Sequence, residues 1–230
     1  MALPGLMMPP GLLAIQGGES DPYWEDVILL MRFNNSFADV KGHTVTASGS
    51  PTFDTGKFGS AVYFAQQNHG QYLHSSNIPA LGTNNFTIEL WVYPMTTGDS
   101  NGGGLFDFRG QSKDAEPHMR LYPNGSWTLL YNDTIVLNGS VATSQWHHVA
   151  LTRAGSTGRF FINGTQQGSN LNFGSSHYSR THVTLGSYVD WRNTGTGGKI
   201  GCKIDEFRVT LGVARYTSAF DVPTKPFPNK

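Results

Sequence analysis

The chain has 230 residues, 28 of them glycine and 12% of them aromatic, and its acidic and basic residues balance to a formal net charge of zero. This length fits one large β domain, because sandwiches and barrels of this size are commonly single units. Only 14% of the residues are charged. The composition therefore lacks the concentrated basic surface that phosphate binding needs, and we expect neither nucleic acid nor an anionic membrane as a partner.

Residues 1–20 are apolar and are interrupted by prolines and glycines. They carry no positively charged leading region, so we expect no signal peptide, no transmembrane span and synthesis in the cytosol. The stretch is too short and broken to form a core of its own. We expect an extended N-terminal arm that packs on a neighbouring subunit and hides its large apolar side chains from water, namely Leu3, Leu6, Met7, Met8, Leu12 and Leu13.

The domain proper is expected over residues 21–230, beginning with a strand at 27–33. That run reads VILLMRF and is continuously apolar, as in a core strand covered on both faces. Residues 86–94 alternate between an apolar face that contains Ile88 and Leu90 and a second face that contains Thr87 and Glu89. This pattern predicts an amphipathic strand. Shorter strands are predicted at 44–47, 60–64, 71–73, 105–108, 118–122, 126–131, 134–137 and 182–185.

Residues 146–168 predict a meander of antiparallel strands. A strand at 146–153 and an aromatic strand at 160–162 are separated by a glycine-rich turn, and Asn163-Gly164 suits a type I′ turn back into the next strand. The last core strand is predicted at 200–209, with Ile204, Phe207 and Val209 facing inward. The single cysteine, Cys202, excludes an internal disulfide, and we expect it to be a buried thiol.

The meander resembles the middle of a laminin G-like domain of the concanavalin A-like jelly-roll class. The resemblance rests on Trp146-His147-x-Val149, the glycine-rich turn and the strand closing on Asn163-Gly164, and on KFGSAVYF (57–64) followed by QYL (71–73). It implies an all-β sandwich of two antiparallel sheets, preceded by the arm and ending in a proline-rich tail. In that family the tryptophan anchors the core. We therefore expect Trp146, His147 and His148 to be packing and pairing residues rather than a metal site or catalytic dyad.

The closing segment resembles laminin G-like domains of tailed-bacteriophage virion proteins. The matching residues are IDEFRV (204–209), GVARYT (212–217), the proline-rich end and the opening DPYW (21–24). This resemblance implies a non-enzymatic virion structural protein made in the host cytoplasm, either a capsid decoration protein or a head- or tail-attached component. It would form a homo-oligomer and dock on major capsid or tail subunits through the arm.

A lectin-like adhesin that recognises host-surface glycans is the alternative hypothesis. It rests on a predicted loop that combines aromatic and polar residues, because sugars stack on aromatic faces while polar groups bind their hydroxyls. The candidate glycan-binding residues are Tyr188, Asp190, Trp191, Arg192 and Asn193.

A third hypothesis is a glycoside hydrolase, because Glu19, Asp21 and Glu25 match the carboxylate spacing of retaining glucanases built on this jelly roll. Pro22 interrupts the motif, which also precedes the first core strand. We therefore expect a solvated linker there and no enzymatic activity.

Asp205 is the one candidate metal ligand that the resemblance suggests. In related domains an aspartate in the closing strand and one after the AVYF strand can hold a structural calcium, but here Ala65 stands at the second position. We therefore expect Asp205 to accept hydrogen bonds from a loop, with calcium as the alternative, and no other cofactor. Its neighbour Glu206 is expected on the opposite face of the strand.

Overall fold

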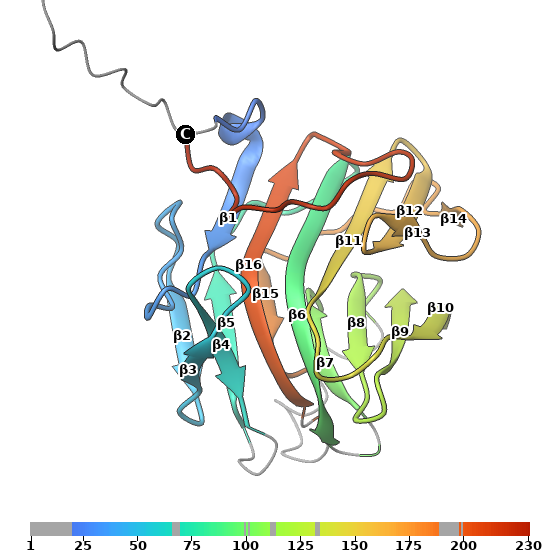
Figure 1. Cartoon of the computed structure of the whole chain (residues 1–230). Coiled ribbons are helices and arrows are strands. Elements are labelled where there is room, and N and C mark those ends of the chain that lie inside the picture. Colours follow the sequence, from blue (N-terminus) through green and yellow to red (C-terminus); the bar gives the residue numbers. More distant parts are fainter. Residues whose placement is uncertain are drawn as a thin grey trace, which may run out of the picture.

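The computed structural model describes residues 20–65, 70–98, 100, 102–110, 114–131, 134–188, 198 and 200–230. Within these residues the chain forms two antiparallel β-sheets, of nine and seven strands, that pack face to face (Figure 1). A short 3-10 helix, η1 (Trp24–Asp26), precedes the first strand. The jelly-roll sandwich expected from the sequence is confirmed. No helix in the described ranges has the length and apolar character needed to cross a membrane.

The nine-stranded sheet is built around its two longest strands, β6 and β16, which pair along most of their length. β1 and β4 lie end to end along the other edge of β16. Across the sheet the strands are β13 (Thr165–Gln166), β12 (Thr157–Ile162), β11 (His147–Ala154), β6 (Phe86–Gly98), β16 (Ile200–Leu211), β4 (Ser60–Phe64) and β3 (Thr52–Thr55), with β1 (Val27–Met31) beside β16 and β14 (Leu171–Asn172) beside β12.

The seven-stranded sheet contains the consecutive strands β7 to β10. The chain leaves it after β10, so the meander that follows lies wholly in the nine-stranded sheet. Across the sheet the strands are β10 (Thr134–Ser140), β9 (Ser126–Tyr131), β8 (His118–Leu121), β7 (Gly103–Asp107), β15 (His182–Leu185), β5 (Tyr72–Ser76) and β2 (Val45–Ser48).

The sequence pattern predicted most of these strands, and β9 and β15 have the predicted bounds. The predicted turn after β12 is confirmed, because Asn163 and Gly164 have φ angles of 49° and 76°, as a type I′ turn requires. The short strands β3 and β14 were not predicted. Neither carries an apolar alternation long enough to recognise.

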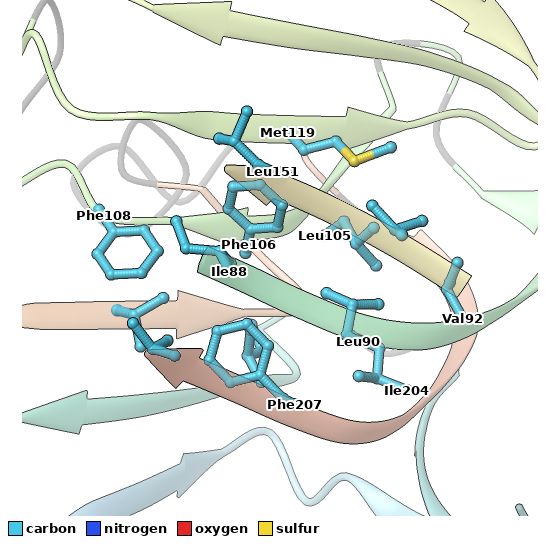
Figure 2. Packing of buried hydrophobic residues seen from close by; sticks show 14 of the residues in the cluster. Ile88, Leu90, Val92, Leu105, Phe106, Phe108, Met119, Leu151, Ile204 and Phe207 are labelled. Atoms are coloured by element: carbon cyan, nitrogen blue, oxygen red, sulfur yellow. The ribbon is translucent and has the colours of Figure 1, made fainter. Parts of the chain in front are cut away.

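The core lies between the sheets and is built from the inward-facing residues of both. Figure 2 shows Ile88 and Leu90 of β6 packed near Leu105, Phe106 and Met119 of the seven-stranded sheet. All five side chains are at most 1% exposed. Burying a side chain of this size contributes about 2 kcal/mol, so this layer provides the main driving force for the sandwich.

β1 is covered on both faces, as predicted. Leu29 and Met31 belong to the main core. Leu30 and Val27 form a second apolar cluster with Phe227, which lies near the end of the chain. The second cluster shows that the C-terminal segment is part of the packed structure.

The polar face of β6 is buried, although the sequence pattern predicts a strand with one face exposed to solvent. Thr87 and Glu89 are fully buried and Trp91 is 3% exposed, although they face away from the main core. Residues 212–230, here called the C-terminal strap, cross the outer face of β11, β6 and β16 (Figure 1). Thr87 is part of this contact, because its Oγ1 donates to the carbonyl of Val213 over 3.0 Å. The strap therefore covers the polar face of the strand.

Further contacts bind the strap along its length. The Tyr216 hydroxyl donates to Glu89 Oε2 (2.8 Å), and the Tyr216 ring stacks on Phe220 with centroids 3.6 Å apart. At the end of the strap, the Asp21 amide donates to the carbonyl of Lys230 (2.8 Å). The start and the end of the described domain are thereby joined.

A network of charges lies beneath the strap. Arg208 donates to Glu89 Oε1 through Nε and Nη2 (2.9 and 2.8 Å) and to Asp21 Oδ2 through Nη1 (2.9 Å). Arg215 also binds Asp21, through Nη2 to Oδ2 (2.7 Å). Burial alone would raise the pKa of Glu89, but the Arg208 guanidinium holds that pKa well below its usual value. The carboxylate is therefore charged and paired, as a buried charge must be.

A β-bulge in β16 changes which way its acidic residues point. Glu206 has a φ of 51°, and the pairing with β6 shifts between Asp205 and Arg208. Ile204 and Phe207 therefore both face the core, although they are three residues apart. Asp205 and Glu206 are near enough for the charge of one to raise the pKa of the other. The expectation that they lie on opposite faces is wrong, because it assumed regular alternation.

Candidate functional site

The outer face of the seven-stranded sheet carries a row of polar side chains. The strand register aligns Thr46 with His74, His74 with Thr184, Thr184 with Asp107, and Asp107 with His118. Side chains of directly opposed residues share a face. Thr184, Asp107 and His118 are fully buried. The middle of this face is therefore closed to solvent.

An ion pair occupies this closed part. Arg109 donates to Asp107 through Nε and Nη2, both over 3.0 Å, in a bidentate arrangement, and neither side chain is exposed. The carbonyl of Arg109 lies 3.1 Å from Nε2 of His182. These groups satisfy one another, so we assign them a structural role.

An open groove lies on this sheet at the end formed by β8, β9 and β10. Its volume is about 610 Å³, within the range of small-molecule sites. The residues that line it are Ser100, Tyr122, Pro123, Asn124, Ser126, Trp127, Thr128, Asn138 and Gly139.

The groove contains polar groups with unused hydrogen-bonding capacity. Asn124 Oδ1 accepts a bond from the Ser126 amide (3.0 Å), which leaves Asn124 Nδ2 as a donor. Asn138 is exposed on β10, opposite Thr128. Within the described residues, the side chains of Tyr122, Ser126 and Asn138 have no hydrogen-bond partner. An aromatic ring, two amides and a hydroxyl therefore meet in one groove.

The charged residue beside this groove is Arg120, which is directed away from it. Arg120 lies on β8 opposite Thr128, but its guanidinium sits over the ring of Tyr188, 4.5 Å from the centroid. Tyr188 follows β15, on the far side of β7 from the groove. A Cβ at Gly104 of β7 would lie 2.5 Å from the carbonyl carbon of Ser187 and 2.9 Å from the Tyr188 amide nitrogen, so the glycine lets this backbone approach β7 closely.

Tyr188 was predicted as a glycan-binding residue, but it is only 6% exposed. Its ring is covered by Arg120 and packs against Gly198, so it offers no face for a sugar to stack on. The other members of the predicted loop, Asp190, Trp191, Arg192 and Asn193, lie outside the described residues, as do the predicted docking residues Leu3, Leu6, Met7, Met8, Leu12 and Leu13.

The expectation of a solvated linker at the carboxylate motif is wrong for Asp21, because this residue is buried in ion pairs. Glu19 lies outside the described residues. Glu25 is exposed, whereas Asp21 is buried between Arg208 and Arg215. Burial tends to raise the pKa of Asp21, but its bonds with these arginines lower it below the usual value. A general acid needs the opposite shift.

Asp205 accepts a hydrogen bond from the Phe58 amide over 2.9 Å, as expected. At the second position suggested by the resemblance, the Ala65 amide donates to Gln71 Oε1 instead. Among the described residues, no three His, Cys, Asp or Glu side chains come together as metal ligands would. Calcium at Asp205 remains an untested alternative.

The histidine pair of β11 packs and pairs, as predicted. His148 is fully buried with its ring centroid 5.2 Å from that of Trp91, and Nε2 of His147 lies 2.8 Å from the carbonyl of Ala142. Trp146, however, does not anchor the core. It is half-buried before β11 begins and meets the ring of Tyr93 edge-on at 5.5 Å. Cys202 is fully buried, as expected, and burial raises the pKa of its thiol.

Sequence reasoning missed the groove. The sequence pattern predicted only strands here, at 118–122, 126–131 and 134–137. The available signal was an aromatic residue beside an Asn-containing turn, Tyr122-Pro123-Asn124, followed by hydroxyls at alternate positions 126 and 128. Asn138 joins them only through the register of β9 and β10.

Residues 66–212, more than half of the chain, match the family model Laminin G 3, described as the concanavalin A-like lectin/glucanases superfamily. The chain belongs to this superfamily. The laminin G-like resemblance is therefore confirmed. No curated protein matches the chain.

Several solved structures have the same fold as this chain, although their sequences are at most 21% identical to it. Domain 4 of AbnA, a GH43 extracellular arabinanase from Geobacillus stearothermophilus, in complex with arabinotriose, is 21% identical with a TM-score of 0.55, covering 82% of this chain and 94% of that one. The binding domain of Botulinum Neurotoxin DC in complex with SialylT is 13% identical with a TM-score of 0.61, covering 86% and 50%. The binding domain of Paraclostridial Mosquitocidal Protein 1 is 10% identical with a TM-score of 0.62, covering 86% and 50%. The chain spans about half the length of the two toxin domains.

Proposed function

We propose that this protein is a non-catalytic carbohydrate-binding domain whose ligand lies in the groove formed by β8, β9 and β10. The observation that carries the proposal is the convergence of the Tyr122 ring with the unpaired polar groups of Asn124, Ser126 and Asn138. A sugar presents an apolar ring face and a rim of hydroxyls, which such a groove can bind by stacking and by hydrogen bonds. Two structural neighbours, solved in complex with arabinotriose and with SialylT, support the same class of ligand.

The lining of the groove supports binding without catalysis. Glycoside hydrolysis generally needs two carboxyl groups flanking the bond that is broken. No carboxylate is among the described residues that line the groove. We therefore expect an oligosaccharide to bind and be released unchanged.

Substitution of Tyr122 and Asn138 by alanine tests the proposal. Each change removes one stacking or hydrogen-bonding group, so we expect each to weaken oligosaccharide binding about tenfold while the melting temperature stays near that of the wild type. Screening on a glycan array, followed by titration calorimetry of the ligands found, measures the effect. Asn170→Ala, at an exposed asparagine of the other sheet, is the matched control.

The proposal fails if no glycan on a broad array binds the wild type, or if Tyr122→Ala and Asn138→Ala bind as well as Asn170→Ala. In the first case the domain is not a lectin of the kind proposed. In the second case it binds glycans elsewhere, and the groove is not the site.

A more specific role, as a structural component of a tailed-bacteriophage virion, is a second proposal. It rests on the resemblance of the 204–209 and 212–217 segments and on the apolar residues of the arm. In this proposal the arm docks the domain on capsid or tail subunits, in a homo-oligomer made in the host cytoplasm, and the groove faces outward. Binding a host-surface glycan and being held on a particle are compatible, because they use different parts of the chain.

A further inference from the structure

The groove is free of charge along its whole described lining. The nine residues are serine, threonine, asparagine, tyrosine, tryptophan, proline and glycine, so the described lining contains no acidic or basic side chain. Hydrogen bonds in the groove therefore come only from neutral amides and hydroxyls. Such groups bind hydroxyls well but give no Coulombic compensation to a carboxylate or sulfate that must leave water.

The charged side chains that share this face are engaged elsewhere. Arg120, opposite Thr128, extends across β7 to the ring of Tyr188, away from β9 and β10. Further along the sheet, Asp107 and Arg109 pair with each other and are fully buried. Of the guanidinium groups in the described residues that share this face, a negatively charged sugar in the groove would reach one only if Arg120 left its position over Tyr188.

We infer that the groove selects neutral saccharides and discriminates against sugars that carry a carboxylate or a sulfate. This inference rests on the proposed carbohydrate-binding function and adds the chemical class of the ligand. Since neither partner carries charge, binding is insensitive to salt and to pH. A charged pair on an open surface would instead weaken as salt shortens the screening length.

Matched pairs of oligosaccharides test the inference. α-1,4-Galactotriose and trigalacturonic acid differ only in that hydroxymethyl groups are replaced by carboxylates, and an array printed with neutral and carboxylated or sulfated members of further backbones extends the comparison. We expect the hits to be neutral, each at least tenfold tighter than its acidic counterpart. Between 20 mM and 500 mM sodium chloride, and between pH 5.5 and 8, the Kd of a neutral hit changes less than about twofold.

Asn138→Lys serves as the gain-of-charge variant, with Asn138→Gln as its neutral control. Asn138 is exposed on β10, so either change is tolerated at the surface. Lysine there should improve the relative binding of the acidic member of a pair and make that binding decrease with salt, whereas glutamine should do neither.

The outcomes separate this inference from the function on which it rests. Suppose that the wild type prefers the acidic members, that this binding depends on salt, and that Tyr122→Ala abolishes it. Neutral selectivity is then overturned, but carbohydrate binding in the groove stands. Failure of every neutral and acidic glycan to bind removes the proposed function and the inference with it. Neutral binding that is unaffected by salt supports both.

Discussion

The two adjacent buried carboxyl groups of β16, Asp205 and Glu206, have raised pKa values. Burial is the largest cause, and it raises the pKa of Glu206 to about 7 and that of Asp205 to about 6. The guanidinium of Arg32, whose Nη1 lies 3.4 Å from Glu206 Oε1, lowers the pKa of Glu206 but offsets only part of the effect of burial. Glu206 also accepts a bond from the Phe227 amide over 2.9 Å, so the state of this carboxyl is coupled to the end of the strap.

The stability of the domain should therefore fall as the pH rises through neutrality. The folded state binds the Glu206 proton more tightly than the unfolded chain, whose pKa is near 4.5. This contribution is fully present below pH 4.5 and is lost as the pH passes about 7. Glu206→Gln removes the titration of this carboxyl and should reduce the decline in unfolding free energy by on the order of 3 kcal/mol. The decline that remains comes from Glu116, whose pKa burial also raises to about 7.

Urea unfolding at pH 5, 6, 7 and 8 measures this difference. Glu25→Gln, at an exposed carboxyl, should keep the wild-type slope. If Glu206→Gln shows the same decline with pH as the wild type, Glu206 is not the group that titrates. Glu116 would then be the next candidate, because burial raises its pKa to about 7 as well.

The strap is the element that closes the outer face of the nine-stranded sheet. Phe227 is its apolar anchor, 1% exposed against Val27 and Leu30, and the guanidinium of Arg208 lies 3.9 Å from its ring centroid. The N-terminal part of the strap is attached through Tyr216, whose ring stacks on Phe220 and whose hydroxyl donates to Glu89. The strap thus shields the ion pairs of Arg208 from water, and their strength depends on that shielding.

Phe227→Ala should cost about 3 kcal/mol of unfolding free energy, because it removes a fully buried ring and leaves a cavity over Arg208. Chemical denaturation measures the cost. Phe220→Ala is the matched comparison, since Phe220 lies on the same strap but is only half-buried, and it should cost less. Equal and small losses for the two variants would show that the strap is not anchored through Phe227.

The described domain contains a hydrophobic core of its own. Its two apolar clusters are made of residues between 27 and 227, and the Asp21 amide is tied to Lys230. Deleting residues 1–20 should therefore leave a folded domain with an unchanged melting temperature and unchanged glycan binding. If the arm docks the protein on a virion, the deletion should also abolish incorporation into particles.

Sedimentation of assembled particles with and without the deletion tests the docking role. The control is a variant in which the apolar side chains of the arm are kept and only its glycines are changed to alanine. If the protein that lacks residues 1–20 is incorporated normally, docking through the arm is contradicted. Loss of folding contradicts the independence of the domain.

Local pattern alone determined most of the strands of this protein. The two-residue period of side chains and the φ angles that Asn163-Gly164 tolerates act over a few residues, so they can be read directly from neighbours in the chain. The same holds for the apolar run of β1, which predicted a strand buried on both faces. The motifs around Trp146 identified the jelly-roll class, although Trp146 itself packs against Tyr93 and does not anchor the core.

Tertiary structure alone decided what covers each face and where side chains converge. Glu89 is buried because Arg208, 119 residues away, pairs with it and the strap closes over both. Because of the bulge at Glu206, the adjacent carboxyl groups of Asp205 and Glu206 lie on the same side of the strand, whereas regular alternation would place them on opposite sides. The groove exists because β8, β9 and β10 bring Tyr122 and Asn138 together. Such long-range contacts depend on strand register and on the path of the chain across the sheets, and neither leaves a signal in any short stretch of sequence.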